Sequence, residues 1–242
     1  MEKKDMLLIL IAVILNIISY IMMIRDISEN KEMYAKKGEK KDNAAENADI
    51  KENEERQIIV SKQCNIYAVI MMAVSVGIAV FLQKFYVDNA FLFNVKRVCL
   101  LSVLWPVAYI DYKSYRIPNT YIILGIVYRV TIIPFELWTD GSRIIYVILS
   151  EMIAGAALFI AAFLCKLFVK NSIGSGDIKL FIVMSLFLGL NGIWNSIILT
   201  MLITFFVCIV LLATKKKSRK DKIPFGPSIV AGTFLSVFLT GM

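Results

Sequence analysis

Long runs of apolar residues alternate with short polar stretches along most of the chain. Most runs are close to the length of about 20 residues that a helix needs to cross a hydrocarbon layer roughly 30 Å thick. The pattern therefore predicts an all-α, polytopic integral membrane protein with seven to eight transmembrane helices. The apolar segments lie at residues 6–24, 58–82, 93–111, 119–137, 144–169, 178–190, 193–213 and 225–242.

One of these segments is too short for a simple crossing. Segment 178–190 has 13 residues, so a helix over it would be only about 20 Å long. We expect it either to cross the membrane incompletely or to turn at Asn191-Gly192 within the outer leaflet.

Another segment, 93–111, carries charges and a proline. We expect the side chains of Lys96 and Arg97 to snorkel to the outer surface, because a charge inside the bilayer is costly. Pro106 should kink the helix about one turn before its end, because proline cannot donate a backbone hydrogen bond.

Composition divides the chain into three parts. Residues 1–24 are predicted to be a retained membrane anchor, because the apolar core is too long for a signal peptide and no A-x-A-like cleavage site follows. Residues 25–57 are rich in Lys, Glu, Asn and Ala, which predicts a solvated cytoplasmic linker, partly helical or disordered. Residues 58–242 form the predicted membrane-embedded domain.

The basic residues indicate an orientation. If the N-terminus lies outside, the inner loops hold most of the Lys and Arg, including those in 25–62 and 215–222. The positive-inside rule favours this arrangement in a cell membrane. It also accounts for the net charge of +8, so we expect the lipid bilayer, and no nucleic acid, as a partner.

The composition also limits the chemistry. The chain contains no histidine, which excludes a Ser-His-Asp triad, a Cys-His dyad and an HExxH zinc site. The four cysteines are scattered, with no CxxC pair. We interpret them as buried apolar thiols and expect no metal site, disulfide framework or cofactor.

Two acidic residues stand at the ends of predicted helices on the same side of the membrane. Asp111 ends the third apolar segment and Asp177 begins the sixth, with two spans between them. The orientation above places both at the cytoplasmic face. An acid at such a boundary costs less than one at the midplane but still needs a reason.

Glycines and prolines surround these acids. Gly174 and Gly176 precede Asp177 in a GxGD sequence, where glycine permits a positive φ angle or a close approach of another segment. Ile117-Pro118-Asn119 follows Asp111 and starts the fourth span. Pro224-Phe225-Gly226-Pro227 opens the last span, with Pro227 suited to a first helical turn.

Together these elements resemble the type IV prepilin peptidases, a family of GxGD membrane aspartyl proteases. The resemblance covers about residues 95–242, with the right order and spacing. It implies that Asp111 and Asp177 are the catalytic pair, and that the substrates are prepilins or pilin-like proteins, cut after a short basic leader at the cytoplasmic end of their apolar helix. Other substrates of this kind, such as preflagellins or competence pseudopilins, remain open.

The chain departs from the bifunctional members of that family. Those carry CxxC pairs that bind zinc between the first two spans, and they also methylate the new N-terminus. Residues 25–57 contain no cysteine. The chain therefore resembles the short, peptidase-only form, and we expect neither zinc nor methyl transfer.

Two close carboxylates cannot both ionise easily, so one pKa is expected to rise. The ionised partner would activate a water molecule and the protonated one would polarise the scissile carbonyl. A helix start favours the ionised form, which makes Asp177 our choice for the base. Lys179 is expected either to bias the pair and hold substrate or to snorkel.

Arg129 and Glu151 are two further charges within the membrane. We expect them to pair if the fourth and fifth spans pack together, in a structural role. Two other functions stay open from the residues: an ion- or proton-coupled transporter that uses Asp111, Asp177, Glu151 and Arg129, and a catalytically silent membrane scaffold of the same fold.

Overall fold

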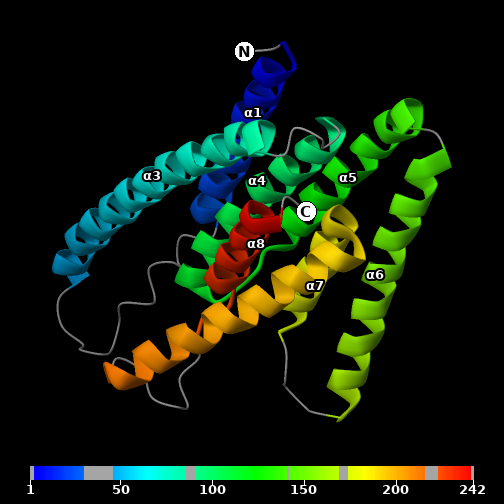
Figure 1. Ribbon diagram of the computed structural model, residues 1–242. Coiled ribbons are helices and arrows are strands. Elements are labelled where there is room, and N and C mark those ends of the chain that lie inside the picture. Colours follow the sequence, from blue (N-terminus) through cyan, green and yellow to red (C-terminus); the bar gives the residue numbers. More distant parts are fainter. Residues whose placement is uncertain are drawn as a thin grey trace.

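The computed structural model describes residues 3–29, 46–85, 91–140, 142–168, 174–215 and 223–240, and every regular element in these ranges is an α-helix (Figure 1). The prediction of an all-α fold is therefore confirmed. The helices are α1 (Lys3–Glu29), α3 (Glu46–Phe85), α4 (Phe91–Ser114), α5 (Asn119–Asp140), α6 (Ser142–Phe168), α7 (Ser175–Ala213) and α8 (Gly226–Thr240).

The lengths and compositions of these helices fit a membrane protein. Among the described residues, six helices are long and apolar enough to cross a bilayer, and α8 is a shorter apolar helix. Large apolar side chains on α5, α6 and α7 lie exposed along their helices. Lipid is the solvent that such surfaces need, because water would disfavour apolar area of this extent.

Helix α4 is the centre of the molecule. Every residue from Asn94 to Asp111 is buried, and α1, α3, α5, α7 and α8 all pack against α4. Its helical assignment continues through Pro106. The last buried residue of this helix is Asp111, so the fold places that carboxylate near the C-terminal end of its most enclosed helix.

The two basic residues of α4 do not snorkel, and that prediction is wrong. Lys96 and Arg97 are each only 2% exposed. The Lys96 ammonium lies 2.8 Å from a carboxylate oxygen of Glu151 on α6, and the Arg97 guanidinium lies 3.6 Å from the centre of the Phe93 ring. Partners inside the bundle thus replace the water that snorkelling would have reached.

The predicted pair of Arg129 and Glu151 is confirmed. Arg129 Nε on α5 donates to Glu151 Oε2 on α6 at 3.0 Å. Glu136 joins them, with a carboxylate oxygen 2.6 Å from Arg129 Nη1. The sequence did not point to Glu136, because it stands near the end of an apolar segment, where an acid is an ordinary boundary residue.

Helix α7 contains the predicted segments 178–190 and 193–213 in one element, and it is broken at Gly189. This residue has φ 65° and ψ −173°, a conformation that is essentially restricted to glycine. The ribbon of α7 bends sharply along its yellow part (Figure 1). The predicted turn at Asn191-Gly192 is therefore misplaced by two residues, and we call Ser175–Leu188 the first half of α7.

The polar stretch between the first two spans is partly helical, as expected. Helix α1 continues to Glu29, and α3 begins at Glu46. The end of α1 is tied to the segment after α4, because Asp26 Oδ1 lies 3.5 Å from Arg116 Nη2. The prediction for residues 30–45 lies outside the described residues.

Candidate functional site

The turn between α4 and α5 places Asp111 in the last turn of a helix. Tyr115 adopts a left-handed conformation with φ 53°, and its N–H donates to the Asp111 carbonyl at 2.8 Å, which is a common way to end a helix. Pro118 then stands directly before the start of α5 at Asn119. Ile117-Pro118-Asn119 therefore separates the two helices, as predicted.

The Asp111 carboxylate meets the beginning of α8. The Gly226 N–H donates to Asp111 Oδ2 at 2.7 Å, and a Cβ atom at position 226 would lie only 2.8 Å from Asp111 Cβ. Free N–H groups at a helix start favour a negative charge. Gly226 is thus required by close approach, and Pro227 occupies the first turn of α8, as predicted.

Asp177 lies in the first turn of α7, three residues after its N-cap Gly174. A Cβ atom at Gly174 would lie 2.7 Å from Asp177 Oδ2, and one at Gly176 would lie 3.0 Å from Ile117 Cβ. Gly174 has φ −61°, and Gly176 is not among the described residues with positive φ. The two glycines of the GxGD sequence therefore serve close approach and not a left-handed backbone.

All four motif elements meet at one place. The carboxylates of Asp111 and Asp177 are near enough to interact electrostatically. Lys179 Nζ donates to Asn119 Oδ1 at 3.0 Å, so its side chain holds the start of α7 to the start of α5. The Phe225 ring, next to Pro224, lies 6.1 Å from the Phe181 ring on α7.

The site is therefore a pair of carboxylates, each beside the start of a helix and each lined by glycine: Asp177 at the start of α7 and Asp111 against the start of α8. Asp111 is 6% exposed, and Asp177 is partly buried. Chemically, such a pair can take a proton from water and give one to a leaving group.

Comparison with known proteins finds a family that resembles part of the chain. Residues 98–213 match the sequence model of the type IV leader peptidase family. Over this stretch the chain is similar to that family. It is 26% identical over 142 residues to a protein of Bacillus subtilis (strain 168) named prepilin leader peptidase/N-methyltransferase, in a match that covers 57% of the chain and 53% of that protein.

The chain thus spans about half the length of this curated relative, and no solved structure matches it. The stretch of this chain that matches the leader peptidase family contains Asp111 and Asp177 and ends before Pro224. The contribution of Gly226 to the site therefore rests on its contact with Asp111.

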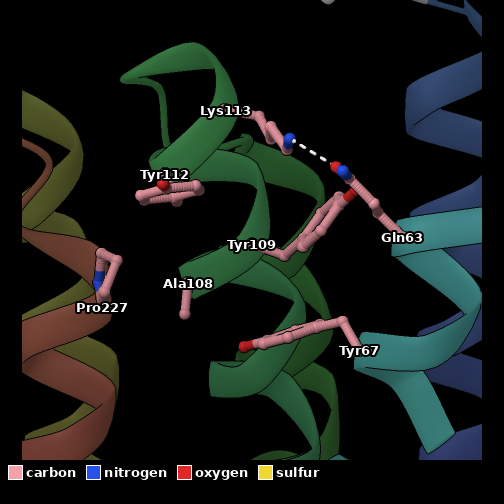
Figure 2. A pocket seen from close by; sticks show the side chains of 7 residues that line it. All are labelled: Gln63, Tyr67, Ala108, Tyr109, Tyr112, Lys113 and Pro227. Atoms are coloured by element: carbon pink, nitrogen blue, oxygen red, sulfur yellow. Dashed lines mark hydrogen bonds between the residues drawn. The ribbon is translucent and has the colours of Figure 1, made fainter. Parts of the chain in front are cut away.

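A pocket is lined by residues of α4 that lie just before and just after Asp111 in the sequence (Figure 2). Its volume is about 350 Å³, and its lining comes from α3, α4 and α8. Lys113 Nζ donates to Gln63 Oε1 at 3.1 Å across its edge. The lining residues are Gln63, Tyr67, Ala108, Tyr109, Tyr112, Lys113 and Pro227.

Sequence reasoning missed this pocket. Tyr67 stands in an apolar segment, where an aromatic residue is expected to pack in a core, and its hydroxyl donates to the Trp105 carbonyl at 3.0 Å. The available signal was the pair Tyr109 and Tyr112 on either side of Asp111. Their polar tips suit the boundary between membrane and water.

Metal ligands are a separate question. Among the described residues, no group of three or more His, Cys, Asp or Glu side chains is placed to hold a metal ion. The four cysteines were predicted to be buried, and this is confirmed for Cys64 and Cys99. It is wrong for Cys165, which is exposed on α6, and for Cys208, which is only partly buried on α7, because both helices present a face that lipid would cover.

Proposed function

We propose that this protein is a membrane aspartyl endopeptidase whose catalytic residues are Asp111 and Asp177. It removes the short basic leader from type IV prepilin-like precursors, such as pilins and pseudopilins, at the cytoplasmic face of the cell membrane. The observation that carries the proposal is that the starts of α5, α7 and α8 converge around the two acids, through the contacts of Gly226 with Asp111, of Lys179 with Asn119 and of Gly176 with Ile117.

The two carboxylates share one proton in the reactive state. The ionised one takes a proton from a water molecule, whose oxygen attacks the scissile carbonyl carbon, while the protonated one donates to the carbonyl oxygen. The C–N bond then breaks and a proton goes to the leaving amine. Because the Asp111 carboxylate accepts the Gly226 N–H at the start of α8, the dipole argument for Asp177 as the base applies to Asp111 as well, and the pair titrates as a unit.

The surrounding residues have positioning roles in this proposal. Gly174 and Gly176 allow the Asp177 carboxylate and Ile117 to approach the start of α7. Lys179 and Asn119 tie this helix to α5. Pro118, Pro224, Gly226 and Pro227 fix the entries into α5 and α8.

The substrate class follows from placement and from the relative. A precursor with an N-terminal apolar helix and a basic leader would present the peptide bond between them at the inner membrane boundary, where the basic loops place Asp111 and Asp177. The Bacillus subtilis relative is named for leader peptidase and N-methyltransferase activities. We propose that this chain has the first activity without the second, because residues 25–57 contain no cysteine.

Co-expression with a pilin-like precursor tests the proposal. The substrate's intact mass would be compared for the wild type, Asp111→Asn and Asp177→Asn, with Glu29→Gln as a control in an exposed ion pair on α1. We expect wild type and the control to cut at the junction of leader and helix without adding a methyl group, and both Asp variants to leave the precursor intact. Cutting by either Asp variant would contradict the assignment of the pair.

A further inference from the structure

A closed ring of four charges lies inside the helix bundle, away from the two aspartates. Lys96 comes from α4, Arg129 and Glu136 from α5, and Glu151 from α6, and their side chains are each at most 4% exposed. Lys96 Nζ lies 3.0 Å from Glu136 and 2.8 Å from Glu151. Arg129 contacts the same two carboxylates.

The ring is neutral, because two cations face two anions and each cation contacts both acids. Burying charges in a membrane protein is costly unless they are paired, and such residues commonly mark functional places. We call Lys96, Arg129, Glu136 and Glu151 the charge ring. Three helices could be joined by apolar packing alone, so the ring must provide something that such packing does not.

Its distinctive contact is with the break in α7. Arg129 Nε also donates to the Leu186 carbonyl at 2.8 Å, in the last turn before Gly189. Carbonyl groups at the end of a helical segment lack partners in the next turn, and a cation there is favourable. Glu151 reaches the same place, because a Cβ atom at Gly189 would lie 3.8 Å from Glu151 Cγ. The ring thus caps the first half of α7.

The first half of α7 lies along α5, and the two helices run in the same direction. Lys179 contacts Asn119 at the end near the aspartates. Gly125 lies so close to Val183 that a Cβ atom there would be 2.6 Å from Val183 Cγ1. Because Arg129 binds Leu186 at the far end, these contacts make α5 and the first half of α7 a single unit.

The ring also holds the other helix that carries a catalytic aspartate. On α4, Lys96 stands 15 residues before Asp111, about 22 Å along the axis. On α7, Leu186 stands nine residues after Asp177, about 14 Å along the axis. The far ends of both helices are therefore tied to one rigid cluster.

We infer that the charge ring is a positioning device: by fixing α4 to the capped first half of α7, it sets the separation of the Asp111 and Asp177 carboxylates. The catalytic part of this inference rests on the proposed function, whereas the geometric part does not. Arg129 is the residue on which the device depends, because its guanidinium contacts both acids and the Leu186 carbonyl at once.

Arg129→Lys is the substitution that tests this positioning role most directly. It keeps the positive charge, but a single ammonium cannot replace the planar guanidinium at three sites. Arg25→Lys is the matched control, since Arg25 forms an exposed ion pair with Glu29 on α1. Glu136→Gln is a second variant, which keeps the shape of the ring and removes one of its charges.

The first readout is a distance that needs no activity. The four native cysteines are first replaced by alanine, and spin labels are then attached to Tyr112→Cys and Ser175→Cys, which are both exposed positions. The distance between the two labels reports the separation of α4 and α7 beside the two aspartates. We expect Arg129→Lys to broaden the distance distribution or displace it by about 2 Å, and Arg25→Lys to leave it unchanged. The second readout is cleavage, in which Arg129→Lys should lower kcat about 10²-fold with little change in KM, because small misplacements of catalytic groups cost that much.

The outcomes separate the two claims. An unchanged distance distribution in both Arg129→Lys and Glu136→Gln overturns the positioning role, whatever the activity. Failure of both variants to accumulate as folded protein also overturns it, because the ring would then serve overall stability. A changed distance with a wild type that never cleaves upholds the positioning role and removes the proposed function.

Discussion

At Gly226 the backbone N–H lies 2.7 Å from Asp111 Oδ2, and a Cβ atom would lie 2.9 Å from the same oxygen. A side chain at this position must therefore displace the carboxylate or the start of α8. The residue acts through its lack of a side chain, and its effect should appear in catalysis more than in folding.

Gly226→Ala is expected to lower the cleavage rate by about 10- to 100-fold, because it would shift the carboxylate of Asp111, which we propose to be catalytic. Gly77→Ala is the matched control, since nothing lies within 4 Å of a Cβ atom at Gly77 on α3. The measurement is the rate of precursor cleavage at equal amounts of folded protein. Equal rates for the two variants would show that the contact between Gly226 and Asp111 has no catalytic role.

Much of the site could be predicted from the sequence at this scale. Asp111, Asp177 and the glycines and prolines beside them were expected to share one site, and the structure brings them together. Glycine at positions 174 and 176 was expected to permit either a positive φ angle or a close approach of another segment, and only the close approach is found. Local sequence indicates where glycine is required, but the neighbour that comes close, such as Ile117, is fixed by the tertiary fold.

At the scale of the helices, the break at Gly189 is a departure from regular helix inside α7. It ends the first half of α7 inside the bundle, where Arg129 caps it. Length alone indicated that residues 178–190 were unusual. The position of the break could not be predicted, because Gly189 and Gly192 are equally permissive in sequence and packing against α6 decides between them.

Gly189→Ala is expected to lower the free energy of unfolding by about 1–3 kcal/mol, because φ 65° with ψ −173° is strained for any residue with a Cβ atom. The measurement is thermal unfolding in detergent, followed by circular dichroism. Gly77→Ala, in a regular and open part of α3, should be neutral or slightly stabilising. If the two variants unfold at the same temperature, the break at Gly189 is not the conformation of the folded protein.

The charge ring also belongs to this scale. Arg129 and Glu151 could be paired from sequence, because each stands in the middle to outer part of a neighbouring span. Lys96 could not be assigned to them, since a basic residue near a helix end normally snorkels. Which faces of α4, α5 and α6 meet is a property of the packed bundle, and no single segment reveals it.

At the scale of the whole molecule, α4 is enclosed by the other helices and both aspartates lie near one end of the bundle. The all-α membrane fold followed from the apolar runs. The orientation rests on the positive-inside rule, and it decides which end of a precursor helix can reach the site.

Labelling of single cysteines with a membrane-impermeant reagent tests the orientation. In a background without the native cysteines, Thr139→Cys at the end of α5 should react in intact cells, because the proposed orientation places this end of α5 outside. Ser175→Cys at the start of α7 should react only after the membrane is opened. Both positions are exposed, so the reverse pattern would place the aspartates on the outer face and contradict cytoplasmic cleavage.

The central claim is that Asp111 and Asp177 act as one catalytic unit. Its most direct test is the cleavage rate of a pilin-like precursor by purified wild type, Asp111→Asn, Asp177→Asn and the double variant. Residues that act as a unit have non-additive effects. We therefore predict that each single variant loses at least about 10²-fold in kcat and that the double variant is no slower than the singles. A single variant that keeps the wild-type rate, or losses that multiply in the double variant, would contradict the account.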